Sequence, residues 1–362
     1  MFADSYAGKT VFVTGHTGFK GSWLCLWLEQ LGARVVGYSL PPPTQPALFN
    51  DAAIAAGIEH IIGDVRDASA LQAALTAARP DFVFHLAAQP LVLDSYLAPD
   101  ETFAINVTGS INLMEAVRRS NTAASVVMVT TDKVYRNREW AYAYREDDSL
   151  GGHDPYSASK AAMEIAVASW RSSFFSADAQ VRIASARAGN VIGGGDWSAN
   201  RLVPDLIRTL AGNGQPRLRN AQSLRPWQHV LEPLAGYLWL GAKLAGPGGE
   251  RYAEAWNFGP QPTEVKCVGD LANALLAQYG KAGWDHVHDP AAPHEAGLLR
   301  LSIDKAVAGL GWRPVWDFAQ TTERTAGWYR AVMDGEVSAR AACAADIDAY
   351  VADACALDVP FA

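Results

Sequence analysis

Short apolar segments alternate with longer helical segments through the first half of the chain. Apolar and β-branched residues gather at residues 9–14, 34–38, 59–62, 81–86, 125–130 and 181–186, and alanine-rich stretches with helical spacing lie between them. Strands that helices cover on both faces read as continuous apolar runs of this kind. The pattern therefore predicts an α/β fold with a doubly wound parallel sheet.

The pattern changes after residue 188. Three consecutive glycines at 193–195 and prolines at 204, 216, 226 and 233 interrupt the alternation, and basic residues gather in the same part of the chain. Residues 256–258 again read as a strand, and the last fifty residues read as helical. We expect one domain over residues 1–188, to which the chain returns near 225–260, and a smaller, mainly ligand-binding region over 189–362.

A glycine-rich turn joins the first predicted strand to the first predicted helix. Its three glycines are each separated by two residues, which allows a tight turn and a close approach of the backbone to a pyrophosphate, with the helix N-terminus behind it. A tight loop with no ligand is the alternative. This position in a βα unit favours a dinucleotide site of the Rossmann type. The candidate cofactor-binding residues of the turn are Gly15, Thr17, Gly18, Phe19, Lys20 and Gly21.

The next two strands carry further candidate contacts to the dinucleotide. The second strand ends in Tyr38 and Ser39, neither an acid nor an arginine, so this feature leaves NAD and NADP open. Asp64 and Val65 follow the third strand, where they are placed to contact the adenine end. The alternative for Asp64 is that it caps a helix over residues 68–78.

Tyr156 and Lys160 form a candidate proton-transfer pair at the start of a predicted helix. Their i,i+4 spacing puts both side chains on one helix face, and a nearby ammonium lowers the pKa of a phenol. Such a pair removes a hydroxyl proton while a hydride leaves the same carbon for a nicotinamide. Thr131, which ends an earlier strand, is expected to share the sugar hydroxyl through a hydrogen bond.

Asp132 and Lys133 come directly after Thr131. The carboxyl ends of parallel strands border the crevice in which open α/β sheets bind ligands, so this charged pair is a candidate for a second proton transfer. A solvated turn is the alternative. A plain dehydrogenase needs no second pair, so the surplus of acid–base groups points to a further reaction step.

Together, the glycine turn, Thr131, Tyr156 and Lys160 resemble the extended short-chain dehydrogenase/reductases that act on nucleotide sugars. Longer segments at residues 130–133, 151–157, 186–197 and 225–233 are similar to those of the CDP-glucose 4,6-dehydratases in that family. The resemblance runs from about residue 9 to about residue 330.

This resemblance implies an NAD-dependent, redox-neutral dehydration of CDP-glucose. Tyr156 takes the O4 proton with help from Lys160 and Thr131, Asp132 protonates the departing C6 hydroxyl, and a neutral Lys133 removes the C5 proton. The resemblance also implies a homodimer or homotetramer. Its further implied contacts are Leu86, Ala87 and Ala88 to the nicotinamide, and Gln89, Asn190, Arg201, Arg219, Arg225 and His229 to the substrate.

Composition narrows the possible partners. The chain has 362 residues, 49% hydrophobic and 19% charged, with a formal net charge of −8. This is the make-up of a folded protein, and the negative charge argues against a nucleic-acid or anionic-membrane partner. The four cysteines show no paired spacing, so we expect no metal site. The N-terminus lacks a basic signal region, which favours a cytoplasmic location.

Two other functions remain open from the sequence. A nucleotide-sugar epimerase or reductase of the same superfamily would use Tyr156 and Lys160 but would not need Asp132 and Lys133 for elimination. A non-catalytic dinucleotide-binding regulator would need none of these proton-transfer groups.

Overall fold

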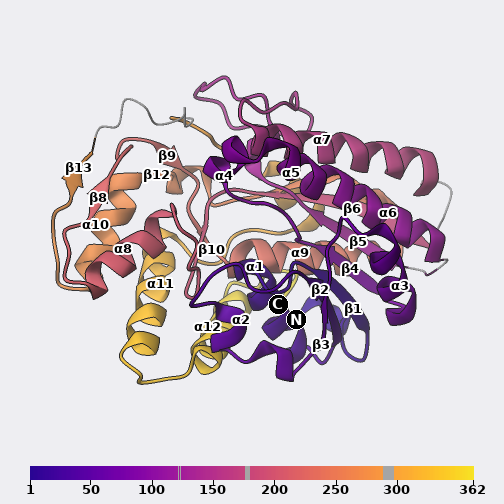
Figure 1. Cartoon of the computed structure of the whole chain (residues 1–362), viewed down its shortest axis with the longest axis horizontal. Helices are drawn as coiled ribbons and strands as arrows, with labels where there is room; N and C mark the ends of the chain where they lie inside the picture. The colour runs from indigo at the N-terminus through magenta and orange to yellow at the C-terminus, as the bar shows by residue number, and fades with distance from the viewer. Residues whose placement is uncertain (121, 123, 176–179, 288–296) are drawn as a thin grey trace.

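A seven-stranded parallel sheet forms the centre of the protein (Figure 1). The computed structural model describes residues 1–120, 122, 124–175, 180–287 and 297–362. From one edge to the other, the strands are β11 (Ala255–Phe258), β6 (Val181–Ala188), β5 (Ala124–Val129), β4 (Phe82–His85), β1 (Thr10–Thr14), β2 (Arg34–Ser39) and β3 (Glu59–Ile62).

The strand order confirms the predicted doubly wound, Rossmann-type α/β fold. The chain builds outward from β1 through β2 to β3, then crosses back to β4 and continues to β11 on the other side. Each of the six strands predicted in the first half is present, within three residues of its expected ends. The change of direction between β1 and β4 opens a crevice at the carboxyl ends of these strands, where such sheets bind ligands.

Helices cover both faces of the sheet (Figure 1). One face packs on α3 (Ala68–Ala78), α6 (Gly109–Ser120) and α7 (Pro155–Trp170). The other face packs on α1 (Phe19–Gln30) and α9 (Leu231–Ala245), with α12 (Ala339–Ala356) lying against α1. This double cover explains why the central strands β1, β4 and β5 are mostly apolar and buried.

The later part of the chain forms smaller units beside the sheet. They are three two-stranded pairs and three helices: β7 (Val191–Ile192) with β10 (Gln228–His229), β8 (Arg217–Leu218) with β13 (Asp285–His286), β9 (Leu224–Arg225) with β12 (Lys266–Cys267), α8 (Leu202–Ala211), α10 (Val268–Gln278) and α11 (Phe318–Met333). Between them, α9 and β11 return to the sheet. The division into domains at residue 188 remains a proposal.

Short helical turns complete the chain. They are η1 (Phe2–Asp4), α2 (Leu48–Asp51), η2 (Ile54–Ala56), α4 (Val92–Leu97), α5 (Pro99–Phe103), η3 (Ala104–Thr108), η4 (Asp132–Val134), η5 (Arg171–Phe175), η6 (Gly249–Tyr252), η7 (Pro262–Glu264) and η8 (Ala306–Leu310).

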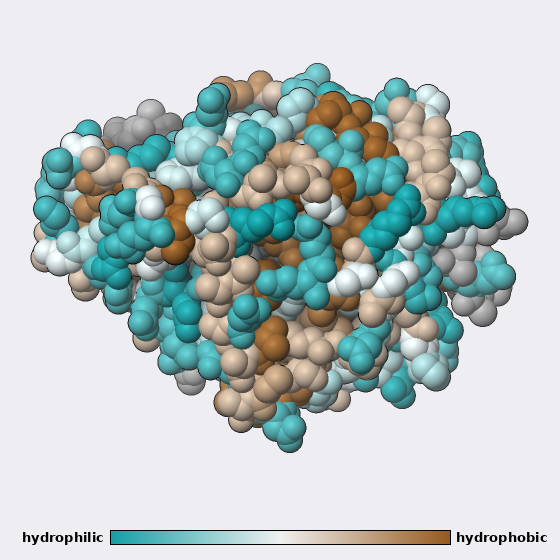
Figure 2. Space-filling view, turned by 90° about the horizontal axis from the view of Figure 1, so that it is seen from below, coloured by the Kyte–Doolittle hydropathy of each residue, from teal (hydrophilic) through white to brown (hydrophobic). Residues whose placement is uncertain are grey.

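The surface mixes hydrophilic and hydrophobic residues on the face viewed from below (Figure 2). Within the described ranges, no helix combines the length and the apolar character needed to cross a bilayer. The same ranges contain no group of three or more His, Cys, Asp or Glu side chains arranged to hold a metal ion.

Candidate functional site

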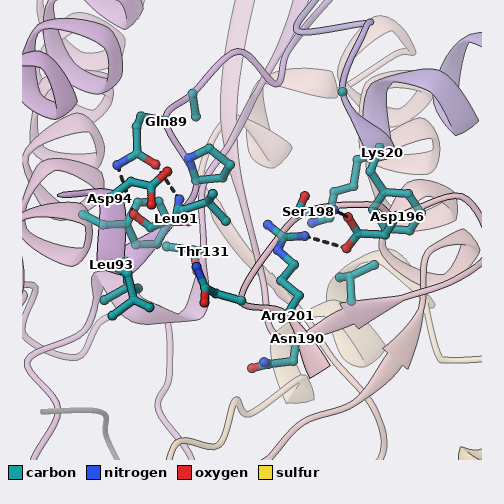
Figure 3. A pocket seen from close by; sticks show the side chains of 18 of the residues that line it. Lys20, Gln89, Leu91, Leu93, Asp94, Thr131, Asn190, Asp196, Ser198 and Arg201 are labelled. Carbon is teal, nitrogen blue, oxygen red and sulfur yellow. Dashed lines mark hydrogen bonds and ion pairs between the residues drawn. The ribbon is translucent and has the colours of Figure 1, made fainter. Parts of the chain in front are cut away.

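A cavity of about 1240 Å³ opens at the carboxyl ends of the central strands. The glycine turn forms one end of it, the ends of β4, β5 and β6 form its floor, and α8 and β8 close the other end. Figure 3 shows Gln89, Leu91, Asp94 and Thr131 on one side of the cavity, with Lys20 and Arg201 on the other.

The glycine turn has the geometry that a pyrophosphate needs. Gly15 has a φ of 76°, and a Cβ there would lie 2.6 Å from the backbone nitrogen of Ala87. A Cβ on Gly21 would lie 2.2 Å from the carbonyl oxygen of Gly15. Helix α1 begins at Phe19, inside this turn, and no side chain caps its first N–H groups. These residues fit a dinucleotide phosphate.

The remaining predicted cofactor residues also line this cavity. They are Thr17, Gly18, Phe19, Lys20, Asp64, Val65, Leu86, Ala87 and Ala88. Asp64 forms an ion pair with Arg66, whose side-chain hydrogen bonds hold the pKa of the Asp64 carboxyl below its usual value. Asp67, not Asp64, caps helix α3 by accepting from the N–H groups of Ser69 and Ala70, so the capping interpretation of Asp64 was wrong.

Tyr156 and Lys160 are buried on the cavity side of α7. The ammonium of Lys160 donates to the carbonyl oxygen of Val129 at 3.2 Å, and burial lowers the pKa of Lys160 to about 8. Burial raises the pKa of the Tyr156 phenol to about 12, while a hydrogen bond with the Thr131 side chain acts in the opposite direction. Thr131 therefore lies at the end of β5 beside the phenol, as expected.

Asp132, the carboxylic acid of the predicted catalytic set, is buried, with 2% of its surface exposed. Its Oδ1 accepts a hydrogen bond of 2.9 Å from the Thr131 hydroxyl. Its Oδ2 is buried and has no hydrogen-bond partner among the described residues. Burial raises the pKa of this carboxyl, and the neighbouring charge of Lys133 opposes that shift. Lys133 is half-buried and lines the same cavity.

Four of the six predicted substrate residues face the cavity with basic or amide groups: Asn190, Arg201, Arg219 and Arg225. Arg201 is oriented by an ion pair of 3.0 Å with Asp196, which is drawn in Figure 3. Its charge also lowers the pKa of the Tyr156 phenol. Arg201 therefore lies close to the reacting end of the cavity.

Gln89 lines the cavity but its amide is used within its own loop. It donates to the carbonyl oxygen of Leu91 and to Thr102, both at 3.0 Å, and accepts from the Leu91 N–H. Its side chain therefore holds the loop after β4, and its predicted contact with the substrate stays a prediction.

The prediction for His229 was wrong. The imidazole is fully buried and does not line the cavity, because it packs edge-on between the rings of Trp23 and Trp316. Its Nδ1 accepts from the N–H of Leu231 at the start of α9. Burial lowers the pKa of His229 to about 3, so the ring is a neutral part of the core.

Two features of the site were missed from the sequence. Asp196, which orients Arg201, lies five residues before it, and that spacing was the available signal. The second feature is a buried ion pair between Glu164 and Arg187 at 2.9 Å, in which Glu164 also accepts from Thr130 and Ser185. Glu164 lies one helical turn after Lys160 and raises the pKa of that lysine.

Known proteins match this chain over most of its length. The model of the NAD dependent epimerase/dehydratase family matches residues 11–254. A CDP-glucose 4,6-dehydratase from Salmonella typhimurium is 45% identical over 336 residues, which cover 91% of this chain and 93% of that protein. A dTDP-glucose 4,6-dehydratase from Streptomyces antibioticus is 30% identical, covering 88% of this chain and 92% of its own.

Solved structures share the fold. A UDP-glucose 4-epimerase from Thermus thermophilus in complex with NAD has a TM-score of 0.76 at 25% identity, covering 89% of this chain and 99% of its own. A dTDP-glucose 4,6-dehydratase from Streptomyces venezuelae with NAD bound has a TM-score of 0.77 at 24% identity, covering 90% and 98%.

The chain belongs to the NAD-dependent epimerase/dehydratase family. Its relatives place it among the nucleotide-sugar 4,6-dehydratases of that family, and its cofactor is NAD. The glycine turn and the ends of β3 and β4 are the parts of the cavity that fit this cofactor.

Proposed function

We propose that this cavity converts CDP-glucose to CDP-4-keto-6-deoxyglucose and water. The observation that carries the proposal is that two proton-transfer sets line the same cavity. Thr131, Tyr156 and Lys160 form the first set, and Asp132 with Lys133 forms the second. An epimerase or a simple reductase has no use for the second set. Identity of 45% with a CDP-glucose 4,6-dehydratase supports the same substrate.

The first set performs the oxidation at C4. NAD, when bound, supplies the hydride acceptor for C4 and later the hydride donor for C6. Tyr156 accepts the O4 proton as the C4 hydrogen leaves, so the phenol must first lose its own proton. The charge of Lys160 stabilises the resulting phenolate, and Arg201 adds to this effect.

The second set performs the elimination. The 4-keto group acidifies the C5 hydrogen, which a neutral Lys133 removes. The neutral carboxyl of Asp132 donates a proton to the C6 hydroxyl as it leaves as water. Burial raises the pKa of Asp132 and so favours this neutral form, and the unpartnered Oδ2 is available to the leaving group.

The basic residues at the far end of the cavity suit the nucleotide diphosphate. Guanidinium groups bind phosphate oxygens in pairs, and Arg219 and Arg225 both line this end. We assign the pyrophosphate to these two arginines, while Asn190 and Arg201 hold the sugar.

A panel of nucleotide sugars tests the proposal. The purified protein with NAD is incubated separately with CDP-, dTDP-, UDP- and GDP-glucose, and products are identified by mass spectrometry. We expect a mass loss of one water with CDP-glucose and much slower turnover with the others. A C4 epimer with unchanged mass would instead establish an epimerase, and no turnover with any sugar would favour a regulator.

We also propose that the protein is a homo-oligomer. Large apolar side chains are exposed on helices α4 and α7, with Leu97 86% and Ile165 61% exposed. These helices pack beside each other, so a second copy can cover both side chains together. Light scattering after size exclusion is expected to give a dimer or tetramer, and Ile165→Glu is expected to shift it toward the monomer. Leu357→Glu, an exposed leucine at the end of α12, is the matched control. A monomeric wild-type protein would contradict the proposal.

A further inference from the structure

The proposed reaction moves one proton across the active site in every turnover. The O4 proton of the substrate passes to Tyr156 during oxidation, and Asp132 gives a different proton to O6 during elimination. The C5 proton is removed and replaced, so it does not enter this balance. At the end of a turnover Tyr156 therefore holds an extra proton and Asp132 lacks one, and both must be reset before the next turnover.

The Thr131 side chain joins these two groups. Its hydroxyl donates to Oδ1 of Asp132 at 2.9 Å, and the Tyr156 phenol lies close enough to the Thr131 side chain for Thr131 to oppose the rise in the phenol pKa. All three side chains are buried. Thr131 caps the 3-10 turn η4, which begins at Asp132. Its side-chain oxygen also accepts from the N–H of Lys133 at 3.4 Å. The local backbone thus holds the hydroxyl between the phenol and the carboxyl.

We infer that Thr131 is a proton relay that returns the O4 proton from Tyr156 to Asp132 within the site. This inference rests on the proposed function. As Oδ2 of Asp132 releases its proton to O6, Oδ1 accepts the proton of the Thr131 hydroxyl. The Thr131 oxygen accepts the phenol proton in the same step. Tyr156 is left as phenolate, Thr131 keeps one proton, and Asp132 is again a neutral acid, so protons and charges balance without a further reactant.

The two carboxylate oxygens of Asp132 have different roles in this relay. Oδ1 faces the relay because it already accepts from Thr131, and Oδ2 has no partner among the residues that the structure describes. The carboxyl has to make a half-turn about its χ2 between turnovers to bring the new proton to the substrate side. Without the relay, Asp132 takes its proton from solvent and Tyr156 loses its proton to solvent, both through a buried cavity.

The test compares Thr131→Val, which removes the hydroxyl at nearly constant volume, with Thr131→Ser, which keeps it. NAD-loaded protein is mixed with CDP-glucose in a single turnover, while absorbance at 340 nm reports oxidation and rapid quench reports the dehydrated product. We expect Thr131→Val to slow elimination by about 10²-fold or more, the scale of a lost proton-transfer group, and to slow oxidation less. The absorbance then rises and stays high. Thr131→Ser is expected to restore elimination.

A substrate whose leaving group needs less help from an acid separates the relay from simple positioning. With CDP-6-deoxy-6-fluoroglucose, fluoride leaves from C6 with little need for a proton. The elimination rate of Thr131→Val, relative to that of wild type, is therefore expected to be at least about tenfold higher with this substrate than with CDP-glucose. A phenol titration followed at 295 nm, without substrate, is expected to show a higher Tyr156 pKa in Thr131→Val, because the lost hydrogen bond lowers it in wild type.

Equal slowing of oxidation and elimination by Thr131→Val, with no lasting absorbance at 340 nm, would overturn the relay and leave Thr131 a positioning residue for O4. Absence of rescue by the fluoro substrate would overturn it as well. Failure of the proposed function is a separate outcome, because wild type would then form no dehydrated product from CDP-glucose.

Discussion

At the scale of single residues, burial shifts the pKa values of the reacting side chains. Lys160 has no carboxylate within ion-pair distance among the described residues, and burial lowers its pKa to about 8. Glu164, one turn along α7, raises that pKa but is itself paired with Arg187. Glu164 therefore favours the charged form of Lys160, which the proposed oxidation requires.

This arrangement predicts a pH dependence. The Lys160 ammonium is present below its pKa and lost above it, so kcat/KM is expected to fall as pH rises through about 8. Glu164→Gln removes the charge that raises this pKa, so the falling limb is expected to move to lower pH, by about one unit at an effective dielectric near 20. Glu323→Gln, at an exposed position of α11, is the matched control. An unmoved limb in Glu164→Gln would show that Glu164 does not act on Lys160.

Lys133 removes the C5 proton in the proposed elimination. Lys133→Ala is expected to lower product formation by about 10²- to 10⁴-fold, the range for a lost general base, while C4 oxidation persists. Incorporation of deuterium at C5 from D2O, measured by mass spectrometry, is expected to fall in parallel. Lys281→Ala, at an exposed loop, serves as the control. Normal C5 exchange in Lys133→Ala would assign the base to another residue.

At this scale the sequence predicted the residues whose position follows from a strand end or a helix repeat. Thr131, Asp132, Tyr156 and Lys160 were placed by these local rules. His229 was misassigned because its local sequence does not reveal that its ring is buried in the core, while the substrate contact of Gln89 stays a prediction. Glu164 and Arg187 lie 23 residues apart on different elements, so formation of their ion pair depends on how α7 docks on β6.

At the scale of elements, the β1–α1 turn leaves no room for a side chain at Gly15 or Gly21. Gly21 lies in the first turn of α1, directly over the Gly15 carbonyl. A side chain there would push the helix N-terminus away from the strand and from the phosphates that it faces. Close backbone contact, rather than the flexibility of glycine, is what the turn requires at this position.

Gly21→Ala is expected to weaken NAD binding by at least about tenfold and to destabilise the fold by about 1–3 kcal/mol, the usual cost of overpacking. Calorimetry and urea unfolding measure the two effects. Gly327→Ala in α11, where a Cβ meets nothing within 4 Å, is the matched control. It is expected to stabilise the protein by about 0.5–1 kcal/mol. Wild-type NAD affinity in Gly21→Ala would contradict this description of the turn.

The long elements were predictable and the short ones were not. The central strands carry short runs of consecutive apolar residues, and the helices between them show helical spacing, so both leave a clear pattern. The β7–β10, β8–β13 and β9–β12 pairs have two residues in each strand, too few for any periodicity. Their pairing is decided by tertiary packing.

At the scale of the whole molecule, a buried carboxyl joins the C-terminal helices to the sheet. Glu232 in α9 accepts from the N–H groups of Val315 and Trp316 and from the Tyr350 hydroxyl of α12. Burial raises the pKa of Glu232 to about 7. The segment before α11 and the helix α12 are thus attached to the same helix that supports β5 and β6.

This carboxyl links stability to pH. Between its unfolded pKa near 4.5 and its folded pKa near 7, the folded protein binds the proton more tightly, so its stabilising contribution is lost as pH rises, by about 1.4 kcal/mol per unit. Buried His85 and His229, whose pKa values burial lowers, act in the opposite direction. The test is therefore the difference in unfolding free energy between wild type and Glu232→Gln. From pH 5 to pH 7.5 the unfolding free energy of wild type is expected to fall relative to that of Glu232→Gln. A difference that stays constant over this range would contradict the linkage.

The overall architecture was predictable because strand order in doubly wound sheets follows simple chain-crossing rules. The docking of α12 on α1 was not predictable, since it depends on contacts such as Trp27 with Tyr350 that join opposite ends of the chain.

Transfer of the C4 hydrogen is the most direct test of the proposed reaction. CDP-glucose carrying deuterium at C4 is incubated with the protein and NAD in ordinary water, and the product is examined by NMR and mass spectrometry. The proposed reaction predicts a 4-keto-6-deoxy product with the deuterium at C6 and no net formation of NADH. Deuterium retained at C4 of an epimer, or NADH accumulating with a 4-keto sugar that keeps its C6 hydroxyl, would contradict the dehydration and the elimination role of Asp132 and Lys133.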